Sequence, residues 1–232
     1  MQNVNSFLRN VPLFKAFNDD HIANLAKLVK LQSFGGEEII FNQEDKGDAL
    51  FIIQLGRIKV SLFSEAGKEI ILSILKEGDF FGEMALIDGE PRSANVTSID
   101  PTELLILERT DFMNYLKQSP DLSLMLLVEM SQRLRIADDK IGSLALLDVY
   151  GRIARYLIKL AKAEGKITKE GIVIVNRPTH QEIAGLVGTS RETVSRTLTD
   201  LQKRGVISVT KDEIILKEDS IEVMEDKYLI YK

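Results

Sequence analysis

The feature that most constrains the fold is a change of hydrophobic period at Ser119-Pro120. Before this point, residues 31–107 break into short apolar runs separated by turn-forming residues, which is typical of β-strands. After it, hydrophobic residues recur every three or four positions, which is typical of a helix. Serine followed by proline also favours a helix start, because serine caps the helix and proline fits its first turn. The pattern predicts an α+β protein with a β-rich part before a helical part.

Five apolar runs define the β-rich part, and each is only four to six residues long. Many short strands between turns indicate a jelly-roll-like β-roll rather than a parallel sheet. A helical start is expected before the strands, at residues 11–28, with Asn18 as its N-cap. The runs are residues 38–41, 49–53, 58–63, 70–75 and 104–107.

The long helix after Ser119 carries a narrow hydrophobic stripe with intervals of three and four residues. Such a stripe is the pattern of a coiled-coil seam. The alternative is a helix packed on its own domain, although that arrangement usually needs a wider stripe. We expect a dimerisation helix, and therefore a homodimer. The seam residues are Leu127, Met130, Leu134, Ala137, Ile141 and Leu144.

The last third of the chain has the signals of a winged helix-turn-helix. Asp148 is positioned to cap a new helix, and Thr179 with Glu182 forms a capping box for the next one. Gly188 is suited to end that helix, and a further helix starts at Thr189-Ser190. Two apolar runs, 206–209 and 213–216, then predict a hairpin. These signals divide the chain into a sensor domain (1–118), a dimerisation helix (119–147) and a DNA-binding domain (148–232).

Composition excludes several classes of site. The chain has no cysteine, which excludes disulfides, iron–sulfur clusters and cysteine-ligated zinc. Its two histidines, His21 and His180, are far apart, so we expect neither a metal nor a haem. No nucleophile–base pair or His/Asp metal cluster stands out, so an enzyme is not expected. The absence of a secretory signal and of a long apolar run favours a cytoplasmic protein without membrane contact.

Residues 81–94 combine groups that suit a phosphorylated sugar. Backbone N–H groups after Gly82, at Glu83, Met84 and Ala85, favour an anion. Arg92 offers a fork for phosphate oxygens, and a carboxylate such as that of Glu83 accepts from a sugar hydroxyl. The alternative is a simple surface pair of Glu83 and Arg92.

This segment, which we call the cassette, resembles the phosphate-binding cassette of the cyclic-nucleotide-binding domain. The resemblance implies that Arg92 neutralises the cyclic phosphate beside the Ser93 hydroxyl, that Glu83 holds the ribose 2′-hydroxyl, and that Gly82, Met84 and Ala85 form the cradle. Gly56 and Gly67 match the same domain.

The residues expected to meet the purine depart from the cyclic AMP receptor proteins. A Thr-Ser pair in those proteins is replaced here by Ala137-Asp138. An ionised aspartate accepts from an adenine amino group, or from two guanine N–H donors; the alternative is that it only solvates the helix. The expected effector is cyclic AMP, with cyclic GMP, a cyclic dinucleotide such as cyclic di-GMP, or no ligand left open.

The net charge of −5 argues against a general nucleic-acid binder, but residues 176–205 carry five basic and three acidic side chains. Helical spacing places four polar residues of this region on one exposed wall, with Val194 and Leu198 toward the core. Arginine there reads guanine, glutamate accepts from cytosine, and hydroxyl and amide groups at helix starts bind phosphates. The wall residues are Arg191, Glu192, Ser195 and Arg196, and the phosphate contacts are Thr179, Gln181 and Ser190.

The segment from Ser190 to Arg196 resembles the recognition helix of the cyclic AMP receptor / fumarate-nitrate regulator family, and residues 144–154 resemble its hinge and fourth helix. The resemblance implies a nucleotide-responsive transcription factor that binds palindromic double-stranded DNA, with TGTGA-like half-sites, as a homodimer. RNA polymerase is an implied partner, through residues 161–171. The alternative is a constitutive DNA-binding regulator with a vestigial sensor pocket.

Overall fold

The computed structural model describes residues 4–217, and they divide into two compact units. Residues 4–67 and 71–135 form the first unit, and residues 68–70 and 136–217 form the second. The division falls inside the long helix α5 (Pro120–Leu146), whereas the sequence was divided at residues 118/119 and 147/148. The first unit is rich in strands and the second contains the helix-turn-helix, so the α+β prediction is confirmed.

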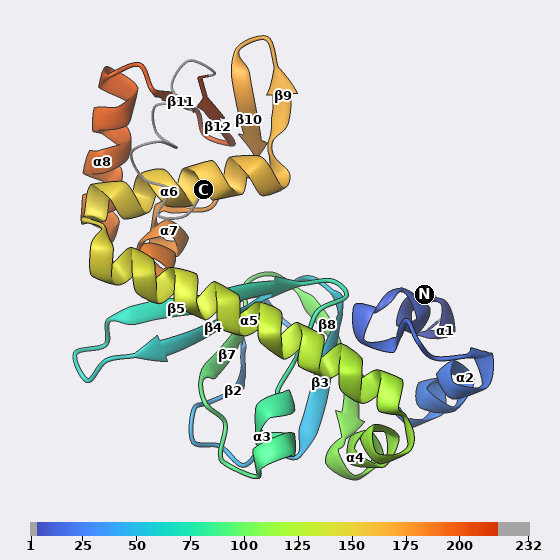
Figure 1. Cartoon of the computed structure of the whole chain (residues 1–232). Coiled ribbons are helices and arrows are strands. Elements are labelled where there is room, and N and C mark those ends of the chain that lie inside the picture. The colour runs from blue at the N-terminus through green and yellow to red at the C-terminus, as the bar shows by residue number, and fades with distance from the viewer. Residues whose placement is uncertain (1–3, 218–232) are drawn as a thin grey trace. The chain divides into compact units, whose positions relative to one another are not determined.

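Two four-stranded sheets form a β-roll in the first unit (Figure 1). One sheet has the order β1 (Lys30–Phe34), β8 (Thr102–Glu108), β3 (Ala49–Leu55) and β6 (Phe80–Phe81). The other has the order β2 (Ile39–Phe41), β7 (Asn95–Ser98), β4 (Arg57–Phe63) and β5 (Glu69–Lys76). The five predicted strands are all present, but β1, β6 and β7 were missed because their sequences are short or lack a clear apolar alternation.

Strand β3 is buried on both faces, which explains its uninterrupted apolar run. Leu50 and Ile52 pack into a core that includes the helices, while Ile53 packs with residues of the other sheet, among them Ile58 and Val96. A strand buried on both sides cannot alternate polar and apolar residues. The α-helices of the first core are α1 (Val4–Asn10), α2 (Asp19–Leu28), α3 (Glu83–Asp88), α4 (Arg109–Gln118) and the first half of α5.

The predicted single helix over residues 11–28 is wrong in its first half. The structure has a 3-10 turn, η1 (Pro12–Phe14), and α2 begins only at Asp19. Asn18 adopts an extended backbone and accepts a hydrogen bond from the His21 N–H at 2.9 Å, so it is the N-cap as predicted. A cap marks a helix start, so residues before it cannot belong to the same helix. Helix α1 was not predicted.

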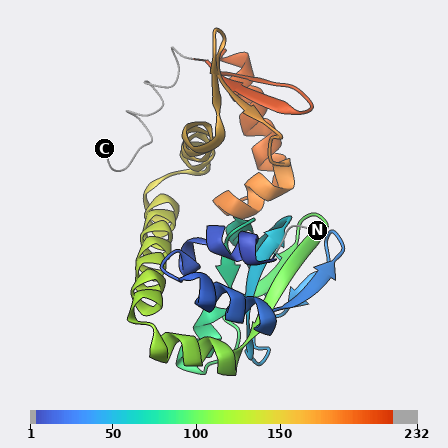
Figure 2. The same cartoon turned by 90° about the vertical axis from the view of Figure 1, so that its right-hand side faces the viewer.

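The second unit is a three-helix core against a small antiparallel sheet, seen in yellow to red in Figure 2. Its helices are α6 (Val149–Glu164), α7 (His180–Val187) and α8 (Arg191–Lys203). The sheet has the order β11 (Ile207–Val209), β12 (Glu213–Leu216), β10 (Gly171–Val175) and β9 (Lys166–Thr168). The predicted hairpin is present as β11 and β12, whereas β9 and β10 were not predicted.

We predict that Gly56→Ala destabilises the first unit much more than Gly67→Ala. Both glycines have positive φ, 90° and 74°, which costs alanine about 1 kcal/mol. A Cβ on Gly56 would also lie 2.6 Å from the Pro101 carbonyl oxygen, whereas nothing lies within 4 Å of a Cβ on Gly67. We expect a loss of about 2–4 kcal/mol at Gly56 and about 1 kcal/mol at Gly67 in urea unfolding. Equal losses would contradict this account.

Candidate functional site

The cassette connects the two sheets of the β-roll through the short helix α3 (Glu83–Asp88). It leaves β6 at Phe81 and returns to the other sheet at β7. Gly82 stands at the turn with φ 84°. A Cβ there would lie 2.6 Å from the Arg92 Nη1 and 3.1 Å from the Ala49 carbonyl oxygen, so the backbone approaches the arginine closely only because residue 82 is glycine.

Arg92 is held inside this turn, with only 4% of its surface exposed. Its Nη1 donates to the Gly82 carbonyl at 2.7 Å, and its Nη2 donates to the Ala49 carbonyl at 2.9 Å. The guanidinium carbon lies 4.4 Å from the centre of the Phe41 ring, a cation–π distance. Its Nε is buried and has no hydrogen-bond partner among the described residues. Arg92 is therefore fixed in place but keeps one donor to offer.

Glu83 is the second buried charge of the cassette, with 3% of its surface exposed. Its Oε1 accepts from the Nη1 of Arg133, on α5, at 3.1 Å. Arg133 also donates to the Phe80 carbonyl at 2.6 Å and pairs with Glu129 at 3.1 Å. The other oxygen of Glu83, Oε2, is buried without a partner among the described residues. The alternative reading, a surface pair of Glu83 and Arg92, is not what the structure shows, because Glu83 is buried and paired with Arg133.

Burial raises the pKa of Glu83, and the charge of Arg133 opposes that shift. The same desolvation lowers the pKa of Arg92 from its ordinary value, against the charges of Asp48 and Glu83. Both shifts show that the cassette is a poorly solvated place for charge, where an added charged or hydroxyl group interacts strongly.

The remaining predicted cassette residues differ in exposure. Met84 is exposed and Ala85 is buried. Ser93 is exposed, and its hydroxyl donates to the Met84 sulfur at 3.8 Å. Ala137 and Asp138 are exposed on the part of α5 that belongs to the second unit, so their contact with a purine remains a prediction.

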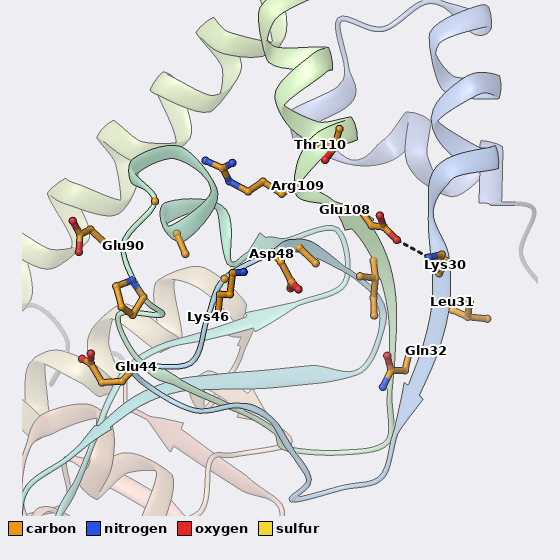
Figure 3. Close-up of a pocket in the computed structure, with 16 residues that line it drawn as sticks. Lys30, Leu31, Gln32, Glu44, Lys46, Asp48, Glu90, Glu108, Arg109 and Thr110 are labelled. Carbon is orange, nitrogen blue, oxygen red and sulfur yellow. Dashed lines mark hydrogen bonds and ion pairs between the residues drawn. The ribbon is translucent and has the colours of Figure 1, made fainter.

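A hollow of about 1140 Å³ is lined by the loop before β3 and by part of the cassette (Figure 3). Its wall includes Lys46, Asp48 and Arg109 together with Ala85 of α3. Glu83, Arg92 and Ser93 do not line it. The hollow is lined by both cations and carboxylates, and the two buried charges of the cassette do not face it, so we place the candidate site at those two charges.

The predicted dimer seam is largely uncovered in the single chain. Leu127, Leu134 and Ile141 are 63–64% exposed, and Leu144 is 39% exposed. Met130 instead packs partly against the first core. Large apolar side chains repeated along one helix are seldom left in water, so this surface indicates a partner.

The helix-turn-helix is built by the caps that the sequence predicts. The Thr179 hydroxyl accepts from the Glu182 N–H at 3.1 Å, and the Thr179 N–H donates back to the Glu182 carboxylate at 2.7 Å. Gly188 ends α7 with φ 70°, and the Ser190 hydroxyl accepts from the Thr193 N–H at 3.2 Å at the start of α8. These contacts fix the turn between the two helices.

The predicted wall of α8 is exposed, whereas Val194 and Leu198 are buried in the second core. Burial and the charges of Arg177 and Arg191 lower the pKa of His180, which shows that cations gather at this end of the unit. Arg177 was not predicted; its Nε donates to the Thr210 carbonyl at 3.0 Å and so braces the hairpin. The seven predicted DNA contacts are all partly or fully exposed on α8 or the starts of the two helices: Thr179, Gln181, Ser190, Arg191, Glu192, Ser195 and Arg196.

Arg133 is the residue of the candidate site that sequence reasoning missed. It lies one position from the seam residue Leu134 and four positions after Glu129, which reads as an ordinary helix-surface ion pair. Arg133 and Glu83 are 50 positions apart in the chain, and no local sequence pattern predicts a contact between residues so far apart.

Within residues 4–217, no group of three or more metal-ligating His, Asp or Glu side chains is found. The helices of the same range include none that is long and apolar enough to cross a membrane.

Comparison with known families gives one match for each unit. Residues 31–119 match the cyclic nucleotide-binding domain, and residues 151–220 match the Crp-like helix-turn-helix domain. The first match contains the cassette, and the second contains α7 and α8.

Relatives match over most of the chain. The cAMP-activated global transcriptional regulator CRP of Escherichia coli is 36% identical over 188 residues, covering 80% of this chain and 89% of that protein. The CRP-like cAMP-activated global transcriptional regulator of Mycobacterium tuberculosis is 30% identical over 217 residues, covering 93% of this chain and 96% of that protein. Among solved structures, the c-di-GMP responsive global regulator CLP of Xanthomonas campestris is 25% identical, with a TM-score of 0.72 over 82% of this chain and 95% of that one.

We predict that Arg133→Met makes stability fall as the pH rises. Without Arg133, the carboxyl of Glu83 stays buried without its hydrogen-bonded counter-ion, and its pKa in the folded state moves further above the unfolded value. The native state then binds more protons than the unfolded state. The contribution of Glu83 to the free energy of unfolding is therefore complete below its unfolded pKa and is lost as the pH rises through its folded pKa. The loss at neutral pH should be about 2–3 kcal/mol, since Arg133 is only partly buried.

Urea unfolding at pH 5 and pH 7.5 measures this effect. The double variant Arg133→Met with Glu83→Gln is the control, because it removes the titrating group and should remove most of the extra pH dependence. If the single variant shows the same pH dependence as the unmodified protein, Arg133 does not stabilise the Glu83 charge.

Proposed function

The chain belongs to the CRP/FNR family of cyclic-nucleotide-binding, DNA-binding transcription regulators, and from that premise we propose that it is a homodimeric regulator whose affinity for a palindromic operator is set by a cyclic nucleotide bound at the cassette. The family consists of transcription regulators and not of enzymes. One observation carries the sensor part of this proposal: the two buried charges of the cassette each keep an atom without a partner among the described residues.

The donor and acceptor at the cassette fit a phosphorylated ribose. The buried Nε of Arg92 is available to an anionic oxygen, and the buried Oε2 of Glu83 is available to a hydroxyl donor. Both atoms lie in a poorly solvated turn and have lost their hydrogen bonds to water. Hydrogen bonds from these atoms to a ligand would replace those lost bonds. Ser93, exposed beside Met84, adds a hydroxyl for the same phosphate.

Cyclic AMP is the effector we propose. Two relatives that are at least 30% identical carry names that describe activation by cAMP. Ala137 and Asp138 leave cyclic GMP or cyclic di-GMP as the alternative, since an ionised aspartate suits two guanine N–H donors. The Xanthomonas neighbour described as c-di-GMP responsive shows that this fold is compatible with another effector.

The second unit supplies the operator contacts in this proposal. Arg191 and Arg196, on the exposed wall of α8, suit guanine edges in the major groove, and Glu192 suits cytosine. Thr179, Gln181 and Ser190 suit phosphates. Two such helices are needed for a palindrome, and the exposed seam of α5 is where we propose that two chains meet. We further propose that the dimer acts in the cytoplasm and contacts RNA polymerase.

Gating requires that the nucleotide bind one arrangement of the dimer better than another. A ligand of equal affinity for both arrangements would shift nothing. Arg133 gives the cassette a direct connection to α5, because it pairs with Glu83 and lies on the helix that carries the seam.

A second candidate, constitutive DNA binding with a vestigial pocket, also has an observation in its favour. Two of the three Arg92 nitrogens already donate to the carbonyls of Gly82 and Ala49, so the arginine is held without any ligand. An operator affinity that is indifferent to every cyclic nucleotide would favour this candidate.

We predict that one of three nucleotides, cyclic AMP, cyclic GMP or cyclic di-GMP, binds the purified dimer in calorimetry. Arg92→Lys should weaken binding at least about tenfold, because lysine cannot replace the guanidinium fork. Ser93→Ala changes an exposed side chain and should cost about 1 kcal/mol, or roughly fivefold. Circular dichroism checks that each variant is folded. Binding by none of the three, or equal binding by both variants, contradicts the sensor proposal.

We predict that Arg191→Ala weakens operator binding by about 1–3 kcal/mol and relaxes the preference at one guanine position. Lys203→Ala, at an exposed position near the other end of α8, is the control and should leave that preference intact. Fluorescence anisotropy with a set of single-base operator variants measures both. Uniform weakening on every sequence would show that Arg191 touches only phosphate.

A further inference from the structure

Three charged residues of the second unit link the end of α5 to α6. The carboxylate of Asp139, on α5, accepts from Arg155 Nη2 through one oxygen and from Lys159 Nζ through the other. Arg155 and Lys159 are one helical turn apart on α6, so a single carboxylate spans both cations. These three residues form what we call the α5–α6 clamp.

The clamp differs from a surface ion pair because Arg155 is buried. Only 4% of its surface is exposed, and its Nε and Nη1 have no partner among the described residues. Within the described part of the chain, Asp139 is therefore the one acceptor that the Arg155 guanidinium contacts. Removing one partner of a buried pair leaves the other charge uncompensated, which is costly.

Burial disfavours ionisation of Asp139, but the hydrogen bond and charge of Lys159, followed by those of Arg155, outweigh it and hold its pKa below the ordinary value. The clamp is therefore charged at neutral pH.

Further contacts tie the same end of α5 to the rest of the second unit. Arg152 Nη1 donates to the Leu147 carbonyl at 3.0 Å, just after α5 ends, and Arg152 Nε donates to the Val187 carbonyl of α7 at 2.8 Å. The Leu144 side chain approaches Gly188, between α7 and α8, so closely that a Cβ there would lie 3.2 Å from it. These contacts agree with the observation that residues 136–146 belong to the same compact unit as α6, α7 and α8.

We propose that the α5–α6 clamp makes the last three turns of α5 and the start of α6 open and close as one cooperative unit, so that a change at residues 136–146 is passed to the helix-turn-helix. The regulatory part of this inference rests on the proposed function. Asp139 directly follows Ala137 and Asp138, which we propose as the purine contacts, so a nucleotide there would act on the clamp's own segment of helix.

Hydrogen–deuterium exchange of the full-length protein tests the clamp without any ligand. Asp139→Asn should raise exchange by at least about tenfold in both 136–146 and 149–155, because amides of one cooperative unit open together. Asp121→Asn, the same change at an exposed position of the same helix, should match the unmodified protein. No increase, or an increase confined to the residues next to 139, would overturn the inference.

Two further variants keep the test decisive if Asp139→Asn unfolds the protein. Lys159→Gln removes only the half-exposed partner and should raise exchange in the same two segments by a smaller factor. Asp139→Glu keeps a carboxylate for both cations and should keep most of the protection that Asp139→Asn loses. Unchanged exchange in Lys159→Gln, or a loss of protection in Asp139→Glu equal to that in Asp139→Asn, would overturn the clamp.

The operator affinity of the same variants separates the clamp from the proposed function. The ratio of operator Kd without and with cyclic AMP should fall at least fivefold toward one in Asp139→Asn, while Asp121→Asn keeps it. An unchanged ratio in Asp139→Asn would overturn the regulatory role. If the unmodified protein itself shows no effect of any cyclic nucleotide, the proposed function fails, whereas the exchange result still decides the clamp.

Discussion

The burial of two opposite charges in one short turn is the constraint on which the sensor unit depends. Arg92 and Glu83 are almost completely removed from solvent. Burial of a charge is tolerated only when hydrogen bonds and counter-charges replace water. The chain supplies two carbonyls and the face of Phe41 for Arg92, and Arg133 for Glu83. The remaining unpaired atoms give the turn its capacity for a phosphate and a hydroxyl.

Helix α5 carries a charged residue of each unit. Arg133 binds Glu83 in the first unit, and Asp139, six positions later, binds Arg155 in the second. Arg133 and Asp139 both lie on one continuous helix, Pro120–Leu146. Both ion pairs involve a buried partner, so neither can be broken without a substantial loss of stability. The same helix also bears the exposed seam, which makes it the element where effector, dimer and DNA-binding unit are coupled in our account.

The sequence predicted the elements that have local signals. Caps at Asn18, Asp148, Thr179 and Ser190 were identified correctly, because a cap depends only on a few neighbouring residues. The missed strands β1 and β7 owe their structure to pairing with β8 and β4, which local pattern does not encode. Arg133 and the clamp were missed for the same reason: each joins residues 16 or more positions apart. The cassette was found only because its whole fourteen-residue pattern resembles a known motif.

The central claim is that nucleotide binding at the cassette changes the affinity of the dimer for its operator. The most direct measurement is a titration of a palindromic duplex with TGTGA-like half-sites by the unmodified protein, followed by fluorescence anisotropy, at fixed salt with and without saturating cyclic AMP, cyclic GMP or cyclic di-GMP. The account predicts that one nucleotide tightens binding by about tenfold or more, the range expected of an allosteric effector. The same Kd in all four conditions would contradict it and would leave a regulator that binds DNA without regard to its sensor.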